Sequence, residues 1–145
     1  MPRFFTSGYE GNNSEDFFAK LKKDKIDILI DVRQNPFSFK QGFNRSQLQI
    51  LASQKNIYYV HIKELGTPVP IRKKLKEFHN YRQFFSEYTD FLREYQDIVE
   101  DLVRLSMEKR VCIICFEKDE NFCHRKVIAK QVHILSGGAL KVCHL

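Results

Sequence analysis

The sequence predicts an α/β fold in one domain, residues 1–145, with a mostly parallel five-stranded sheet and helices on both faces. Five apolar runs of strand length recur along the chain, and segments with helical periodicity separate them. Most of these runs are continuous rather than alternating, which is typical of strands buried on both faces of a parallel sheet. The pattern is Rossmann-like, with a possible strand order of 3-2-1-4-5.

The elements follow from the local patterns. The expected strands are, in chain order, RFFTSG (3–8), IDILIDV (26–32), IYYVHI (57–62), VCIICF (111–116) and LKVCHL (140–145). Asn13 or Ser14 can cap a helix over 14–23, and 44–56 offers a second helix. Apolar residues keep a helical spacing from Phe84 to Val103, which predicts a long amphipathic helix with room for one break. A last helix is expected over 123–135, before the stop at SGG.

The composition narrows the class of protein. A net charge of +6 favours an anionic partner such as nucleic acid, nucleotide or a small phosphate. No apolar run approaches the roughly 18 residues that cross a bilayer, and the start lacks the pattern of a secretory signal. We therefore expect a cytoplasmic protein without membrane contact, whose four cysteines are free thiols rather than disulfides.

Polar side chains follow the expected strands at the point where each strand ends. In an open α/β sheet, ligands bind outside the carboxyl ends of the strands. The residues expected to meet there are Tyr9, Glu10, Asp31, Arg33, His61, Cys115, Glu117, Cys123, His124 and Arg125.

Five stretches also resemble a known family. TSGYEGNN, LIDVRQNPFS, YYVHIKELGTP, YRQFFSEYTDFL and ICFEKDENFCHRKVIAKQV are similar, in that order, to the motifs of the family called domain of unknown function 488, or DUF488. The resemblance runs nearly end to end and implies a compact α/β domain whose motif residues cluster into one site. The chain departs from many members at Thr67, where they carry a second glycine.

Cys123, His124 and Arg125 stand together at the start of the last expected helix. A helix N-terminus holds anions and acidifies a thiol, so we expect an anion site in which Arg125 and Arg33 clamp the ligand. In the alternative, Cys123 packs as a small apolar residue and Arg125 pairs with Glu117 or with Asp119.

Three carboxylates come from neighbouring strand ends. Glu10, Asp31 and Glu117 could hold Mg²⁺ or Mn²⁺, or serve as acid and base, although a carboxylate beside an arginine more often forms an ion pair. The ion pair is the favoured interpretation for Asp31. Glu10, Glu117 and Cys123 are thus the catalytic candidates, and His61 is either a ligand contact or hydrogen-bonded structure.

The cysteine spacing argues against two further kinds of site. No zinc site is expected from Cys115, Cys123, His124 and His61, because structural zinc ligands usually come in pairs two to four residues apart. A cysteine-dependent phosphatase needs Arg six residues after its Cys, and the residue six after Cys115 is Asn121.

Phe37, Phe39 and Phe43 lie among basic residues in the loop NPFSFKQGFNR. Aromatic rings interleaved with positive charge can stack on nucleic-acid bases. The favoured alternative is an apolar lid, which would still shape a substrate pocket.

These features together favour a domain that binds or processes nucleic acid, a nucleotide or another phosphate-bearing ligand. Two alternatives remain from other classes. One is a non-catalytic interaction module, and the other is a thiol-dependent enzyme that uses Cys123.

Overall fold

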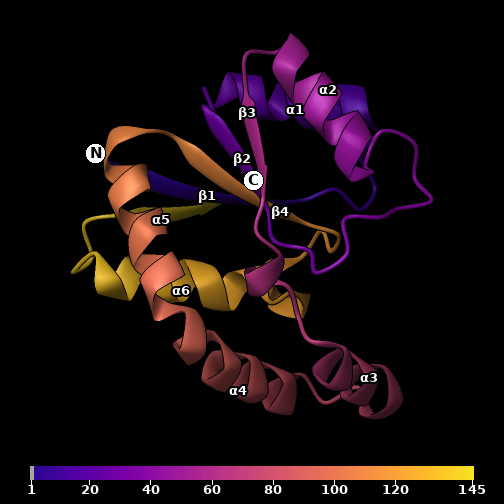
Figure 1. Ribbon diagram of the computed structural model, residues 1–145, viewed down its shortest axis with the longest axis vertical. Helices are drawn as coiled ribbons and strands as arrows, with labels where there is room; N and C mark the ends of the chain where they lie inside the picture. Colours follow the sequence, from indigo (N-terminus) through magenta and orange to yellow (C-terminus); the bar gives the residue numbers. More distant parts are fainter. Residues whose placement is uncertain (1) are drawn as a thin grey trace.

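The computed structural model describes residues 2–145, and all five expected strands form in it (Figure 1). They are β1 (Arg3–Gly8), β2 (Ile28–Asp31), β3 (Tyr58–His61), β4 (Val111–Cys115) and β5 (Lys141–His144). Every pairing between neighbouring strands is parallel. The α/β class with a parallel five-stranded sheet is therefore confirmed.

The order of the strands differs from the expected 3-2-1-4-5. The sheet runs β3-β2-β4-β1-β5, so β4 and not β1 lies next to β2, and β1 rather than β4 lies next to β5. All five residues of β4 are buried, and the strand pairs with β1 on one side and β2 on the other. VCIIC carries no charged side chain, and this suits it to the central position, where both faces and both edges are covered.

Two helices cover one face of the sheet, α1 (Ser14–Lys23) and α2 (Arg45–Gln54) (Figure 1). The Asn13 side chain caps α1 by accepting a hydrogen bond from the Asp16 amide at 2.7 Å, as one of the two expected caps. Phe17, Phe18, Leu21, Leu48 and Ala52 belong to one buried cluster with Phe5, Leu29, Cys112 and Ile114 of the sheet.

The opposite face is covered by α4 (Tyr81–Leu92), α5 (Gln96–Glu108) and α6 (Arg125–Leu135) (Figure 1). The long helix expected over 84–103 is broken once, by the 3₁₀ turn η2 (Arg93–Tyr95). A further helix, α3 (Val69–Phe78), packs against α4 at the end of the molecule away from α1 and α2. None of the helices in residues 2–145 combines the length and the apolar character needed to cross a membrane.

Gly8 ends β1 where the chain leaving β4 passes over it. A Cβ atom added at Gly8 would lie 1.7 Å from the carbonyl oxygen of Glu117, well inside any van der Waals contact. The absence of a side chain at this position therefore lets the 116–122 loop approach the sheet edge.

We predict that Gly8→Ala lowers the free energy of unfolding by about 2 kcal/mol or more, because the new methyl group must push the 116–122 loop away from β1. The matched control is Ser7→Ala, one residue earlier. The buried Ser7 hydroxyl has no hydrogen-bond partner among the described residues, so its removal should change stability by less than about 0.5 kcal/mol or raise it. Denaturant unfolding of both variants measures the difference, and equal losses would contradict the close approach.

Candidate functional site

The carboxyl ends of β1, β2 and β4 meet around a cavity of about 540 Å³. This volume lies within the range typical of small-molecule sites. The cavity is lined by Tyr9, Arg33, Gln34, Asn35, Phe37, Ser38, Phe39, Lys40, Thr67, Arg72, Leu75, Phe84, Cys115, Phe116, Glu117, Phe122 and His124. Five of the ten residues expected at the strand ends thus line one cavity: Tyr9, Arg33, Cys115, Glu117 and His124.

Asp31 and Arg33 form a buried ion pair in the wall on the β2 side. The Asp31 carboxylate accepts hydrogen bonds from Nε and Nη2 of Arg33 at 2.8 and 2.6 Å, and from the Tyr59 hydroxyl at 2.5 Å. Nη1 of Arg33 donates to the Tyr9 hydroxyl at 3.1 Å. The ion-pair interpretation of Asp31 is confirmed, and most of the Arg33 charge is neutralised within the protein.

The ionisation of this wall follows from the same contacts. Burial alone would lower the pKa of Arg33, but its hydrogen bonds to Asp31 and the Asp31 charge outweigh burial and raise that pKa. Burial and then the Asp31 charge raise the pKa of Tyr59, which therefore stays protonated and donates. His61 contacts the backbone of this wall through Nε2, 2.7 Å from the Arg33 carbonyl oxygen, so it is hydrogen-bonded structure here.

Arg125 does not clamp a ligand in this structure. Its side chain is fully buried, and its guanidinium donates to the carbonyl oxygens of Glu117 and of Lys118, the second at 3.0 Å. Nε donates to the Thr6 hydroxyl of β1 at 3.2 Å. The expected anion clamp is wrong, and so is the alternative of an ion pair with Glu117 or Asp119, because Arg125 holds backbone carbonyls instead.

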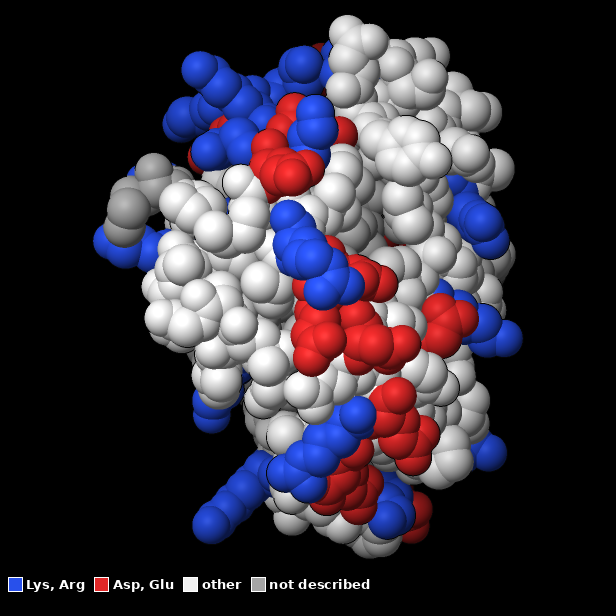
Figure 2. All heavy atoms as spheres, turned by 60° about the vertical axis from the view of Figure 1, so that its left-hand side comes forward, with Lys and Arg blue, Asp and Glu red and all other residues white. Residues whose placement is uncertain are grey.

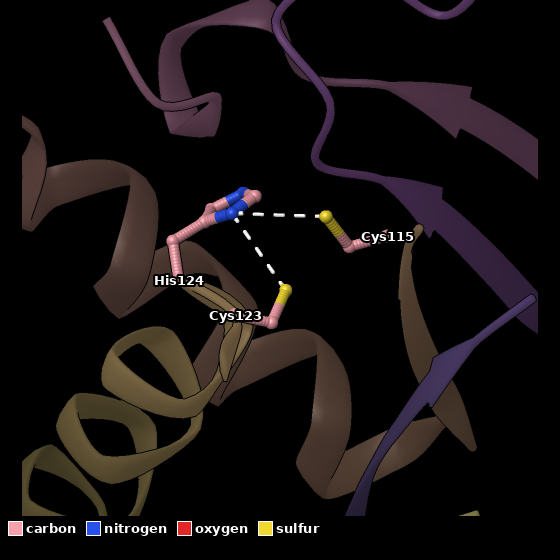
Figure 3. Close-up of side chains that lie close together, drawn as sticks. All are labelled: Cys115, Cys123 and His124. Atoms are coloured by element: carbon pink, nitrogen blue, oxygen red, sulfur yellow. Dashed lines mark hydrogen bonds between the residues drawn. The ribbon is translucent and has the colours of Figure 1, made fainter. Parts of the chain in front are cut away.

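The side chains of Cys115, Cys123 and His124 lie close together (Figure 3), and Cys115 and His124 line the cavity. Nδ1 of His124 lies 3.7 Å from Sγ of Cys115 and 3.8 Å from Sγ of Cys123. Nε2 of the same ring is 2.8 Å from the Val32 carbonyl oxygen, which can only accept. Nε2 therefore carries a proton, and Nδ1 points its lone pair at the two thiols in the neutral ring.

The expected acidic thiol at Cys123 is wrong. The residue is 1 % exposed, and burial together with the neighbouring Cys115 raises the pKa of Cys123 well above its ordinary value. Desolvation outweighs the field of the helix N-terminus, which in any case starts at Arg125 rather than at Cys123. Burial would lower the pKa of His124, but the adjacent Cys123 sulfur raises it. Of the two thiols, Cys115 lines the cavity and Cys123 does not.

The candidate catalytic carboxylates do not form a shared metal site. Glu10 is exposed and accepts a hydrogen bond from the Lys118 amide at 3.0 Å, so it anchors the 116–122 loop. Glu117 lines the cavity, and its carboxylate lies 3.3 Å from Sγ of Cys115. Within residues 2–145, the one group of three or more donor atoms close enough to hold a metal is that of Cys115, Cys123 and His124. The structure therefore does not bring Glu10, Asp31 and Glu117 together around a shared Mg²⁺ or Mn²⁺.

The aromatic loop divides into one buried ring and two exposed rings. Phe43 is fully buried and stacks on Tyr9 with ring centroids 4.5 Å apart, so its expected role in stacking on bases is wrong. Phe37 and Phe39 are 54% and 98% exposed and contact each other edge to face at 5.0 Å. Both line the cavity, as a lid or a stacking surface would.

Several residues at the cavity were not candidates from the sequence, among them Arg72, Phe116 and Phe122. Arg72 lies in the basic stretch IRKKLKEF, which is indistinguishable from a solvated helix face until α3 is placed. Phe116 and Phe122 flank the charged loop after β4 and are 45% and 48% exposed. Their exposure depends on the path of that loop. The charged residues of the loop predict that it is exposed to solvent, but they do not predict where it runs.

The fold and the site define a parallel α/β domain with one cavity at the carboxyl edge of its sheet. The model of the family described as domain of unknown function DUF488 matches residues 13–132, and the chain belongs to this family. Comparison with curated proteins gave no match, and comparison with solved structures gave none either.

We predict that Arg125→Met lowers the free energy of unfolding by about 3 kcal/mol or more, because two loop carbonyls and the buried Thr6 hydroxyl lose the donor that joins the loop to β1. Lys126→Met is the control, since Lys126 is the next residue and is exposed, and it should change stability by less than about 0.5 kcal/mol. Thermal or urea unfolding measures both. An Arg125→Met variant as stable as the wild type would show that these contacts do not hold the loop in place.

Proposed function

We propose that the cavity binds a nucleotide unit, a planar base with a phosphate attached, either as a free nucleotide or within a single strand of nucleic acid. The observation that carries this proposal is the combination of exposed aromatic rings and uncompensated cations around one cavity. A planar ring and an anionic group are the two chemical features that such a lining recognises.

The aromatic contribution comes from two loops. Phe37 and Phe39 follow β2, and Phe116 and Phe122 follow β4, and each ring is at least 45% exposed. Exposed rings of this size gathered at one cavity usually mark a binding surface. Stacking of a base on such a ring contributes about 1–3 kcal/mol and depends little on which base it is.

The positive charge comes from Lys40 and Arg72. Lys40 Nζ lies 3.2 Å from the Tyr9 carbonyl oxygen, and Arg72 donates to the Gln34 side chain at 2.8 Å. Neither belongs to an ion pair among residues 2–145, so both charges are free to meet a phosphate. Glu117 is the single acidic residue that lines the cavity.

The face shown in Figure 2 supports an attraction of phosphate to the cavity rather than to the whole of that face. On the face shown in Figure 2, acidic and basic side chains are interspersed in small clusters. The net charge of +6 is therefore not gathered into one basic field on that face. This distribution favours recognition at the cavity over coating of a long duplex by charge alone.

The four cysteines are free thiols. Free thiols support a reducing compartment, and we place the protein in the cytoplasm on that ground. The alternative of a thiol enzyme that uses Cys123 has less support, because Cys123 is buried and does not line the cavity.

We predict that the full chain binds mononucleotides or short single-stranded oligonucleotides, measured by isothermal titration calorimetry. Phe39→Ala should weaken binding by about 1–3 kcal/mol if the ring stacks on a base. Arg72→Met should weaken binding and reduce its dependence on salt, since one phosphate contact is lost.

Each variant has a matched control on a neighbouring surface. Phe78 on α3 is 64% exposed and Arg82 on α4 is exposed, and neither lines the cavity. Phe78→Ala and Arg82→Met should leave affinity unchanged. Tighter binding of oligonucleotides than of mononucleotides would identify single-stranded nucleic acid, rather than a free nucleotide, as the ligand. No binding of either kind by the folded chain would overturn the proposal.

A further inference from the structure

The side chains of Cys115, Cys123 and His124 form a cluster at the wall of the cavity, which Cys115 and His124 line and Cys123 does not. Their donor atoms all lie within 4.8 Å of one another, and all three residues are buried (Figure 3). Cys115 comes from the end of β4, whereas Cys123 and His124 come from the chain just before α6. The 116–122 loop, held by Arg125, brings the two segments together.

The spacing of the three atoms suits a tetrahedral ion. Zinc binds thiolate sulfur at about 2.3 Å and imidazole nitrogen at about 2.0–2.1 Å, which places sulfur and nitrogen about 3.6 Å apart in a tetrahedral site. The two observed distances from Nδ1 of His124 to sulfur are 3.7 and 3.8 Å. Binding would thus require only a small contraction of the cluster.

The groups around the three donors already orient them as ligands. The Val32 carbonyl oxygen accepts from Nε2 of His124, which leaves Nδ1 available, and metal-binding histidines usually have such a partner. The Arg125 amide lies 3.5 Å from Sγ of Cys123, so its N–H donates to the sulfur. The Tyr88 ring packs against the imidazole edge to face at 5.1 Å, which fixes the plane of the ring.

Charge also favours a divalent ion at this place. Two thiolates in a buried site would be strongly unfavourable without a positive partner. A divalent cation neutralises the two thiolates, and the two thiol protons leave to solvent as the ion binds. The Glu117 carboxylate, 3.3 Å from Sγ of Cys115, adds a further negative charge that favours a cation here. Thiolate and imidazole together select zinc-type ions over magnesium or calcium.

We propose that Cys115, Cys123 and His124 bind one Zn²⁺-type ion through two thiolates and Nδ1. Three protein ligands leave a fourth coordination position open, and Cys115 and His124 line the cavity, so an ion held by them would lie at the cavity wall. Three protein ligands with an open fourth position are typical of zinc sites that act on a bound molecule rather than sites that only stabilise a fold. The expected absence of a zinc site rested on the spacing of the ligands along the chain, and the fold brings Cys115 to the other two. This proposal does not depend on the binding of nucleotides.

The test uses tag-free full chain, reduced and stripped with a chelator, and then titrated with Zn²⁺ against a chromophoric competitor. We expect one ion per chain and a higher melting temperature, because the ion binds the folded site more strongly than the unfolded chain. Co²⁺ in place of Zn²⁺ should give sulfur-to-cobalt charge-transfer absorption of two thiolates and the intense visible bands of a tetrahedral site. This spectrum is measured on the wild type and does not depend on the folding of a variant.

Cys123→Ser should lower Zn²⁺ affinity by more than about tenfold, since even the loss of an outer partner of a ligand has that effect. Cys143→Ser is the matched control, because Cys143 is a half-buried free thiol of β5 outside the cluster. It should keep one ion per chain and the cobalt spectrum.

Three outcomes would overturn the proposal. They are no Zn²⁺ or Co²⁺ uptake by the reduced, folded wild type, equal losses in Cys123→Ser and Cys143→Ser, or a cobalt spectrum without sulfur charge transfer. A Cys115–Cys123 disulfide in oxidised protein, with no uptake after reduction, would identify the pair as a dithiol instead. Calorimetry with nucleotides on the same metal-free and metal-loaded samples separates a failure here from a failure of the proposed function.

Discussion

The site depends on one buried cation, the guanidinium of Arg125. A buried charge is tolerated only when its hydrogen-bonding groups find partners, and Arg125 finds them in two loop carbonyls and a hydroxyl of β1. These contacts tie the start of α6, the end of β1 and the loop between β4 and α6 into one unit. The loop carries Glu117, Phe116 and Phe122, so the shape of the cavity follows from an interaction outside it.

The second buried arginine acts in the same way on the other wall. Arg33 is held by Asp31, and Asp31 is held in turn by Tyr59 of β3. The charged side chains in both walls thus fix the positions of neighbouring groups, and Lys40 and Arg72 are the lining cations outside the ion pairs of the described residues. The two arginines that sequence reasoning assigned to a ligand both bind protein groups here, Arg125 fully buried and Arg33 in the cavity wall.

The central place of β4 joins the cavity to the thiol and imidazole cluster. β4 lies between β2 and β1, so its carboxyl end opens between Arg33 and Tyr9. Cys115 is the last residue of that strand and is shared by the cavity and the cluster. The opposite face of the same strand carries Cys112, where burial raises the pKa to about 12, so position within one short strand gives two thiols different surroundings.

The sequence by itself determined the five strands, the helices other than α3, and the edge of the sheet where the polar residues meet. Continuous apolar runs specify buried parallel strands, the Asn13 cap specifies the start of α1, and these signals are local. Only the tertiary structure decided which strand lies next to which, because parallel pairing joins segments that are far apart in the chain and each continuous apolar run could fill the centre. For the same reason it alone decided that Arg125 is buried, that Arg72 reaches the cavity, and that Cys115 meets Cys123 and His124. Burial and distance between segments are properties of packing, and packing is not encoded at any one position.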